Sequence, residues 1–228
     1  MQVYASPYQP SCGEWAFGYP HAQDRFNPPS PSSLYARLID PITSLFTTPP
    51  LPHQNPIPSF PAVDILLTHG PPLGNLDTVR PPFNLSNTGP LGDHKGCPHL
   101  AAAVKRAKPR LHCFGHIHEA RGALRVAWFG QDSGKALRTP EEKQRERGGG
   151  DGDGDGDEEG EGEVEDAHGV KASRIDVSAA SGRPLQFGKE TVFVHAAIRD
   201  GNDRVANRPW VVVLDLPVVD GAEKVRPV

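Results

Sequence analysis

The amino-acid sequence predicts an α/β protein, because two apolar strands flank one amphipathic helix. The runs AVDILLTHG at 62–70 and RLHCFGHIH at 110–118 are typical of buried strands that end in polar residues. Between them, PHLAAAVKRA at 98–107 gathers its apolar residues on one helical face; these are Leu100, Ala103, Val104 and Ala107. This order of elements indicates a sheet whose strands are connected through a helix.

Further strands are predicted before and after this unit. They are QVYASPYQP at 2–10, ALRVAWF at 123–129, TVFVHAAI at 191–198 and WVVVLDL at 210–216. Because several of these strands follow one another without a helix, the sheet is expected to become partly antiparallel. SPSSLYARLID at 30–40 predicts a short helix, since Ser caps precede apolar residues at helical spacing.

Two segments are expected to lie outside the folded core. Residues 47–61 contain so many prolines that an extended loop is predicted there. Residues 131–189 include an acidic, Gly-rich tract with few large apolar residues, so we expect a disordered insertion. The chain holds 25 Pro and 24 Gly, a share typical of proteins with such segments.

The composition excludes several classes of protein. Residues 151–166 carry ten of the 28 acidic side chains, and without them 18 acidic residues face 24 basic ones, a net charge of +6. That balance suits an anionic substrate but identifies no partner by itself. No run of 18 apolar residues and no signal peptide is present, so no membrane association is expected.

Cysteine usage predicts a reducing compartment. Cys12, Cys97 and Cys113 are odd in number and form no CxxC pair. Neither a disulfide framework nor a cysteine-rich zinc module is therefore indicated. We expect an intracellular, cytoplasmic protein.

GHIH at 115–118 is the sharpest functional signal. Beside Gly115 the chain can turn just past a strand end, so that His116 and His118 reach one centre or two adjacent ones. Taken alone, such a pair is better interpreted as solvated loop residues. His69 changes this interpretation, because two strands that each end in His at one sheet edge fit a ligand site there.

The segments DILLTHGPP, GCPHLAAAVKRAKPRLHCFGHIHEARG, FVHAAI and RPWVVVLDLP resemble the calcineurin-like metallophosphoesterases. The nearest branch is that of the cyclic-nucleotide-phosphodiesterase-like members. The resemblance implies a partial four-layer α/β/β/α sandwich without its N-terminal strands. Residues 1–130 and 190–228 would then form the C-terminal part of a metallophosphoesterase domain.

The resemblance also implies a set of site residues. In that family two divalent transition metals of the Mn, Fe or Zn class are bridged by an Asp and by a hydroxide that attacks phosphorus. Carried over by motif, His69 and His116 would ligate one metal and His118 the other. Substrate-binding or supporting roles are implied for Gly70, Gly115 and His195, the last at a position where the family commonly has Asn.

The remaining ligands of that family would lie upstream of residue 1, in its D-x-H, GDxxD and GNHD/E motifs. Three His without a bridging carboxylate cannot hold two dications in the required geometry. At most one metal ion is therefore expected here, no catalytic residue is assigned, and intrinsic activity is expected to be weak or lost.

Three hypotheses for function stay open. The leading one is a metal-dependent phosphoester hydrolase of the phosphodiesterase type, acting on a small-molecule phosphoester. The alternative is a non-catalytic module that binds one metal, or a partner through an exposed sheet edge and the acidic tract. The third is an unstable product without activity. The sequence carries no signal for an oligomeric state.

Two other motifs, at 151–156 and 105–110, are not interpreted as binding sites. DGDGDG at 151–156 imitates an EF-hand loop, but Gly162 occupies the twelfth position, where Glu is required. KRAKPR at 105–110 is explained by the basic end of a helix, so no nucleic-acid partner is expected. Five further histidines are interpreted as surface or packed imidazoles; these are His53, His94, His99, His112 and His168.

Overall fold

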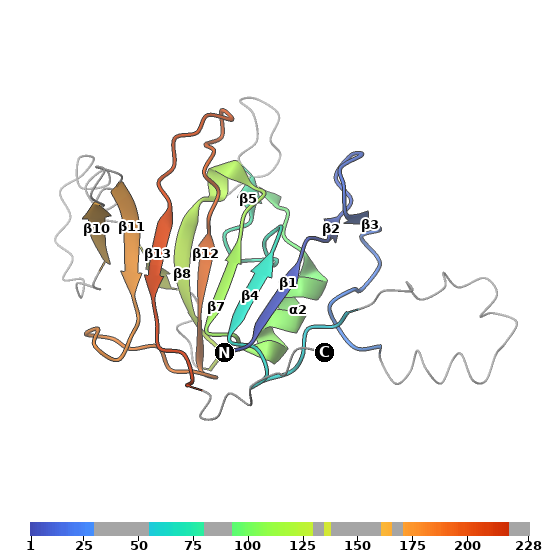
Figure 1. Cartoon of the computed structure of the whole chain (residues 1–228). Coiled ribbons are helices and arrows are strands. Elements are labelled where there is room, and N and C mark those ends of the chain that lie inside the picture. The colour runs from blue at the N-terminus through green and yellow to red at the C-terminus, as the bar shows by residue number, and fades with distance from the viewer. Residues whose placement is uncertain (30–54, 80–92, 130–134, 138–160, 166–170, 219–228) are drawn as a thin grey trace, which may run out of the picture.

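A computed structural model describes residues 1–29, 55–79, 93–129, 135–137, 161–165 and 171–218 (Figure 1). Its centre is a six-stranded sheet with the order β1-β4-β7-β12-β8-β9. The strands are β1 (Val3–Ser6), β4 (Ile65–Thr68), β7 (Leu111–Phe114), β12 (Glu190–His195), β8 (Gly122–Ala127) and β9 (Lys135–Leu137). Neighbours from β1 to β12 pair parallel, whereas β8 and β9 pair antiparallel. The predicted α/β class with a partly antiparallel sheet is confirmed.

Helix α2 (Pro98–Ala107) covers one face of this sheet (Figure 1). The thiol of Cys97 accepts the Leu100 N–H at 3.3 Å as the N-cap, and Pro98 stands where the helix leaves an N–H unpaired in any case. Lys108 ends the helix in the left-handed conformation. The four residues expected on its apolar face are all buried, in one core with Leu66, Phe114 and Phe193 of the sheet.

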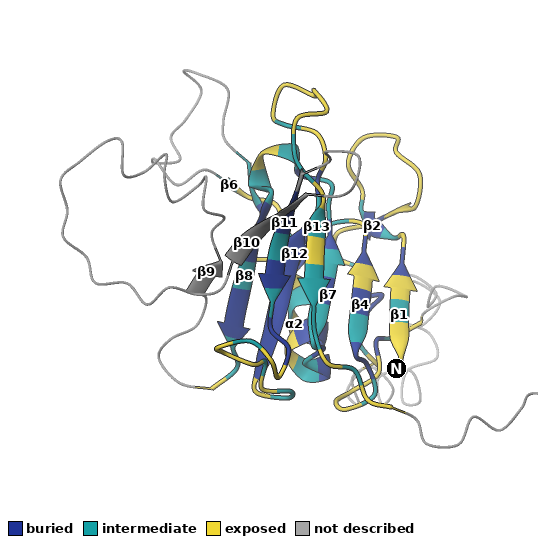
Figure 2. Ribbon diagram, turned by 60° about the vertical axis from the view of Figure 1, so that its left-hand side comes forward, coloured by how far each residue is buried: buried dark blue, intermediate teal, exposed yellow. Residues whose placement is uncertain are grey.

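A second sheet packs on the opposite face of the first (Figure 2). It contains β10 (Glu161–Glu165), β11 (Lys171–Asp176) and β13 (Trp210–Val213). Ile175 and Val212 from this sheet share a second core with Val192 and Val194 of β12. The described residues thus form a helix layer and two sheet layers; the fourth layer implied by the resemblance stays a prediction.

Strands β10 and β11 lie within residues 131–189, where we expected a disordered insertion. Ala172, Ile175 and Val177 of this stretch are buried, so it contributes to the folded core. KASRIDV contains three apolar residues without strict alternation, and the run is short and follows a long polar tract. The helix predicted over 30–40 and residues 47–54 of the proline-rich loop lie outside the described residues; residues 55–61 form neither helix nor strand.

Short elements complete the described part of the chain. Strand β2 (Gln9–Pro10) pairs with β3 (Gly18–Tyr19), and β5 (Thr78–Val79) pairs with β6 (Asp93–His94). A single 3₁₀ turn, η2 (His118–Ala120), follows the end of β7. Among the described helices, none combines the length and the apolar character that crossing a membrane requires.

Candidate functional site

The candidate site lies where the parallel strands β4 and β7 end. The two strands run in register, with Leu67 beside Cys113, so both chains leave the sheet at the same edge. One residue further, the N–H of Gly115 donates to the carbonyl of His69 over 2.9 Å. This backbone bond continues the pairing past the strands and holds the two loops together, as the sequence predicts for a site at this edge.

The imidazoles of His69 and His116 meet across this edge. Nε2 of His69 lies 3.1 Å from Nδ1 of His116, and the two ring centroids are 4.9 Å apart. One of these nitrogens donates and the other accepts. The two strand ends thus bring these two histidines into contact, and their role as metal ligands stays a prediction.

The backbone of His116 is held in an unusual conformation. Its φ is 77°, in the left-handed region that side chains other than glycine and asparagine rarely adopt. A Cβ added at Gly70 would lie 3.8 Å from Cδ2 of His116, which is ordinary contact, so Gly70 borders this ring without being required by the space there. Backbone strain of this kind persists only where the surrounding structure stabilises it, and it is common at functional sites.

His118 begins η2 and contacts a different residue. Its Nδ1 lies 3.5 Å from Oδ1 of Asp203, whose other oxygen lies 3.1 Å from Arg199 Nη1. His118 nevertheless lines the same open groove of about 670 Å³ as His69 and His116. The structure therefore places all three predicted ligands in one groove but joins only two of them directly.

His195 is the last residue of β12, beside Phe114 and Gly122 in the neighbouring strands. It is fully buried, its ring packs edge-on to Phe114 at 5.2 Å, and neither ring nitrogen has a hydrogen-bond partner. Burial, with a smaller contribution from His116, lowers the pKa of His195 to about 4. It is thus a buried neutral imidazole that feels the charge of His116 and His118, and its supporting role stays a prediction.

The electrostatics of the groove favour neutral imidazoles. Burial lowers the pKa of His69, and burial together with the nearby His69 and His118 lowers the pKa of His116. A neutral ring keeps a lone pair available near pH 7, which is the state that binds transition metals.

The residues present fit a two-metal centre only in part. The described part of the chain contains no group of three or more His, Cys, Asp or Glu arranged to hold an ion. The bridging carboxylate that a two-metal centre needs is not among these residues either. This edge of the sheet provides two neutral imidazoles, those of His69 and His116, with His118 in the same groove.

Trp15 and Asp203 also contact histidines of the site, although no sequence pattern indicated either residue. The Trp15 ring stands perpendicular to that of His116, with the centroids 5.5 Å apart. Asp203 reaches His118 from a turn in which its own φ is 62°. Both lie in irregular segments, where no periodicity marks the direction of a side chain.

The other described histidines make contacts outside this pair, and Nε2 of His21 lies 3.0 Å from the Ser11 carbonyl oxygen. His94 pairs with the buried Asp77 at 2.7 Å, and His99 lies 3.4 Å from Asp24. His112 is buried and shares a 2.8 Å hydrogen bond with the Thr68 hydroxyl. His53 and His168 lie outside the described residues.

Comparison with known proteins finds relatives for about half of the chain. Over 125 residues it is 37% identical to Metallophosphoesterase domain-containing protein 1 of Homo sapiens and to the Mus musculus protein of that name. The match covers 54% of this chain and 27% of each relative. A UPF0046 protein of Caenorhabditis elegans is 33% identical over 123 residues, which cover 54% of this chain and 22% of that protein. The chain thus spans about a quarter of the length of the curated relatives it matches.

Neither a model of a protein family nor a solved structure matches the sequence.

Proposed function

We propose that this chain, which is related to the metallophosphoesterase family, forms part of a metal-dependent phosphoester hydrolase of the phosphodiesterase type. The observation that carries the proposal is the pairing of His69 with His116, 3.1 Å apart at the ends of parallel strands. Two neutral imidazoles at a sheet edge are suitable donors for ions of the Mn, Fe or Zn class.

The chain's own residues would hold and orient the donors of the site. The bond from Gly115 to His69 fixes the two loops, and the left-handed backbone of His116 aims its ring at His69. The ion, when bound, would polarise the phosphoryl oxygens and lower the pKa of a bound water. The groove shared by His69, His116 and His118 would receive the phosphoryl group.

A complete two-metal centre would need carboxylates in addition to these imidazoles. Their negative charge balances two dications and sets the separation between them. We therefore expect the residues described here to bind at most one ion, and the chain by itself to hydrolyse phosphoesters slowly or not at all. The four-layer sandwich belongs to the same proposal, since it would supply the elements around this edge.

The donor set also supports a second candidate function, a non-catalytic module that binds one metal ion. A structural or regulatory zinc site needs only three or four protein ligands. His69, His116 and His118 line one groove, and His118 would have to turn from Asp203 toward the other two to complete a three-ligand site.

A combined metal titration and hydrolysis assay separates the two candidates. The purified chain would be titrated with Zn²⁺ or Mn²⁺ while hydrolysis of bis(p-nitrophenyl) phosphate is followed. Binding with turnover supports the hydrolase, and binding without turnover supports the module. The His69→Ala variant should lose metal affinity, whereas His99→Ala, a change outside the groove, should not. Unchanged affinity in His69→Ala rejects both candidates.

A further inference from the structure

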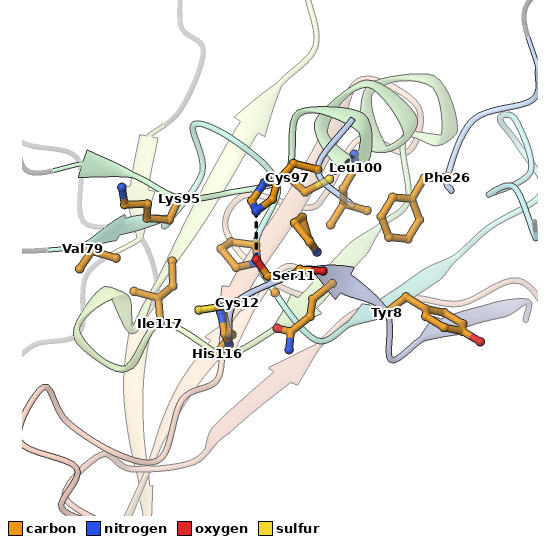
Figure 3. Close-up of a pocket in the computed structure, with 15 residues that line it drawn as sticks. Tyr8, Ser11, Cys12, Phe26, Val79, Lys95, Cys97, Leu100, His116 and Ile117 are labelled. Atoms are coloured by element: carbon orange, nitrogen blue, oxygen red, sulfur yellow. Dashed lines mark hydrogen bonds between the residues drawn. The ribbon is translucent and has the colours of Figure 1, made fainter. Parts of the chain in front are cut away.

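The loop that carries His69 borders open space on two sides. Gly70 lines a cavity of about 380 Å³, in whose wall the side chain of His116 also lies (Figure 3). His69 itself lines the open groove of about 670 Å³. A loop beside such volumes has few side chains packed against it there. Its conformation therefore depends on the hydrogen bonds that its backbone makes.

The carbonyl groups of two consecutive residues in this loop accept hydrogen bonds. The His69 carbonyl accepts the Gly115 N–H at 2.9 Å. The next carbonyl, that of Gly70, accepts the Thr68 hydroxyl, also at 2.9 Å. The first donor is a backbone group, which a change of side chain leaves in place, whereas the second donor is a side chain. Residue 68 is therefore a position at which a substitution can release the loop.

The Thr68 hydroxyl also contacts a buried histidine in the neighbouring strand β7. Its Oγ1 lies 2.8 Å from Nε2 of His112. His112 is fully buried, and its ring packs against Phe114 at 4.8 Å and against Phe193 at 5.5 Å, measured between ring centroids. These aromatic contacts hold the ring, so Nε2 meets the hydroxyl from a fixed direction.

The two hydrogen bonds of Thr68 assign the tautomer of His112. A hydroxyl has one hydrogen, and the Gly70 carbonyl can only accept, so both bonds form together only if Nε2–H of His112 donates to Thr68. Nδ1 then carries no proton, and it is the ring nitrogen that lacks a partner among the described residues. In protein interiors an unpaired acceptor is less rare than an unpaired N–H. Burial also lowers the pKa of His112 to about 3, so the ring is neutral near pH 7.

We propose that His112 is a positioning residue for His69, acting through the Thr68 hydroxyl and the Gly70 carbonyl. Nε2–H of His112 orients the hydroxyl, and the hydroxyl holds the loop that presents the His69 ring to the groove. The inference rests on the proposed function, which makes His69 a metal ligand. Residues that orient a ligand from behind typically change metal affinity by about 10–100-fold when they are removed.

Three substitutions in the full chain separate positioning from stability. Thr68→Val replaces the hydroxyl by a methyl group, and Thr68→Ser retains the hydroxyl. Thr191→Val is the matched control, because the buried Thr191 hydroxyl accepts the Trp128 indole N–H and donates to the Pro109 carbonyl at the other end of the sheet. Calorimetric titration with Zn²⁺ should give a Kd about tenfold higher for Thr68→Val. Thr68→Ser and Thr191→Val should stay close to the wild type.

A double-mutant cycle tests the part played by His112. His112→Phe keeps an aromatic ring in the core but removes Nε2–H, and it should also raise the Kd for Zn²⁺. Because His112 and Thr68 act through one chain of hydrogen bonds, the double variant should bind Zn²⁺ no more weakly than Thr68→Val alone. Two substitutions that merely loosen the core would give additive effects.

A second measurement needs no metal. In EDTA, ¹⁵N NMR of the ring nitrogens should place the proton of wild-type His112 on Nε2. Thr68→Val should shift the ring signals of His69 and His116, which lie 3.1 Å apart across the edge, whereas Thr191→Val should leave them unchanged.

The outcomes distinguish failure of this inference from failure of the proposed function. Wild-type affinity for Zn²⁺ in Thr68→Val, additive effects in the double variant, or a His112 proton on Nδ1 would each overturn the positioning role. A wild-type chain that binds no Zn²⁺ rejects the metal site instead. The ring signals in EDTA then decide the positioning role, and His69 signals that Thr68→Val leaves unchanged would overturn it.

Discussion

Nε2 of His69 and Nδ1 of His116 lie 3.1 Å apart, although 47 residues separate them in the chain. The contact arises because β4 and β7 pair in parallel and end at the same edge of the sheet. The bond from Gly115 to the His69 carbonyl carries that pairing one residue beyond the strands. This edge, and the core that supports it, can be tested by substitution.

The backbone strain at His116 should be measurable by comparing two substitutions. Both His116→Gly and His116→Ala remove the imidazole, but only Gly adopts a φ of 77° without steric cost. We expect the Gly variant to be more stable than the Ala variant by about 1 kcal/mol in urea unfolding. An Ala variant of equal or greater stability would show that the left-handed backbone is not retained in solution.

The free energy of unfolding should fall in mild acid, because two histidines are buried as neutral imidazoles. Burial lowers the pKa of His112 to about 3 and that of His195 to about 4, below the unfolded value of about 6.5. The unfolded state therefore binds more protons below about pH 6.5, so stability is full above that pH and declines as the pH falls toward 4. Each histidine should remove about 2 kcal/mol between pH 7 and pH 5.

Urea unfolding at several pH values measures this decline. The His112→Leu variant should lose about half of the pH dependence, because one titrating group is gone. Val104→Ala, an equally buried change without a titratable group, should keep the full dependence. A His112→Leu profile parallel to that of the wild type would contradict the prediction.

A buried ion pair joins β8 to the start of β12. Arg125 Nη2 lies 2.7 Å from Glu190 Oε2, and both side chains are nearly inaccessible to solvent. Burial opposes ionisation of Glu190, but hydrogen bonds from Arg125 and the Gln186 N–H outweigh it and lower its pKa. Glu190→Gln leaves a buried guanidinium without its counter-charge and should cost about 3–5 kcal/mol.

The exposed pair of Lys95 and Asp93, at 3.2 Å, is the matched control for this ion pair. Lys95→Met should change the free energy of unfolding by less than about 1 kcal/mol. Thermal and urea unfolding compare the two variants. Similar costs for both would mean that the Arg125–Glu190 pair is solvated.

Gly96 leaves no space for a side chain before α2. A Cβ at this position would lie 2.6 Å from backbone atoms of Pro72, in the segment that pairs with Cys97. Gly96→Ala should therefore destabilise the fold by about 1–3 kcal/mol. Gly182→Ala, where no atom lies within 4 Å of the new Cβ, should stay close to the wild type. Calorimetric melting temperatures decide between these outcomes.

The regular elements were predictable because their apolar residues either recur at helical spacing or form short runs. The apolar face of α2 and the strands β4, β7, β8, β12 and β13 all follow from such patterns. The meeting of His69 with His116 was predictable for a related reason, since parallel strands end at one edge. Strand β11 was missed because its six residues are mostly polar, do not alternate strictly and follow a polar tract, as the residues of a loop would.

The contacts made from irregular segments could not be predicted in the same way. Asp203 and Trp15 reach the histidines from turns. No spacing rule connects such residues to a site, because their directions depend on tertiary packing.

Zinc titration of the ¹⁵N-labelled chain, read from the imidazole nitrogens, tests the central claim most directly. We predict that the ring signals of His69 and His116 shift together as the first equivalent of zinc binds, while those of His99 do not. Rings of His69 and His116 that stay unchanged through the titration would contradict the assignment of this sheet edge as a metal site.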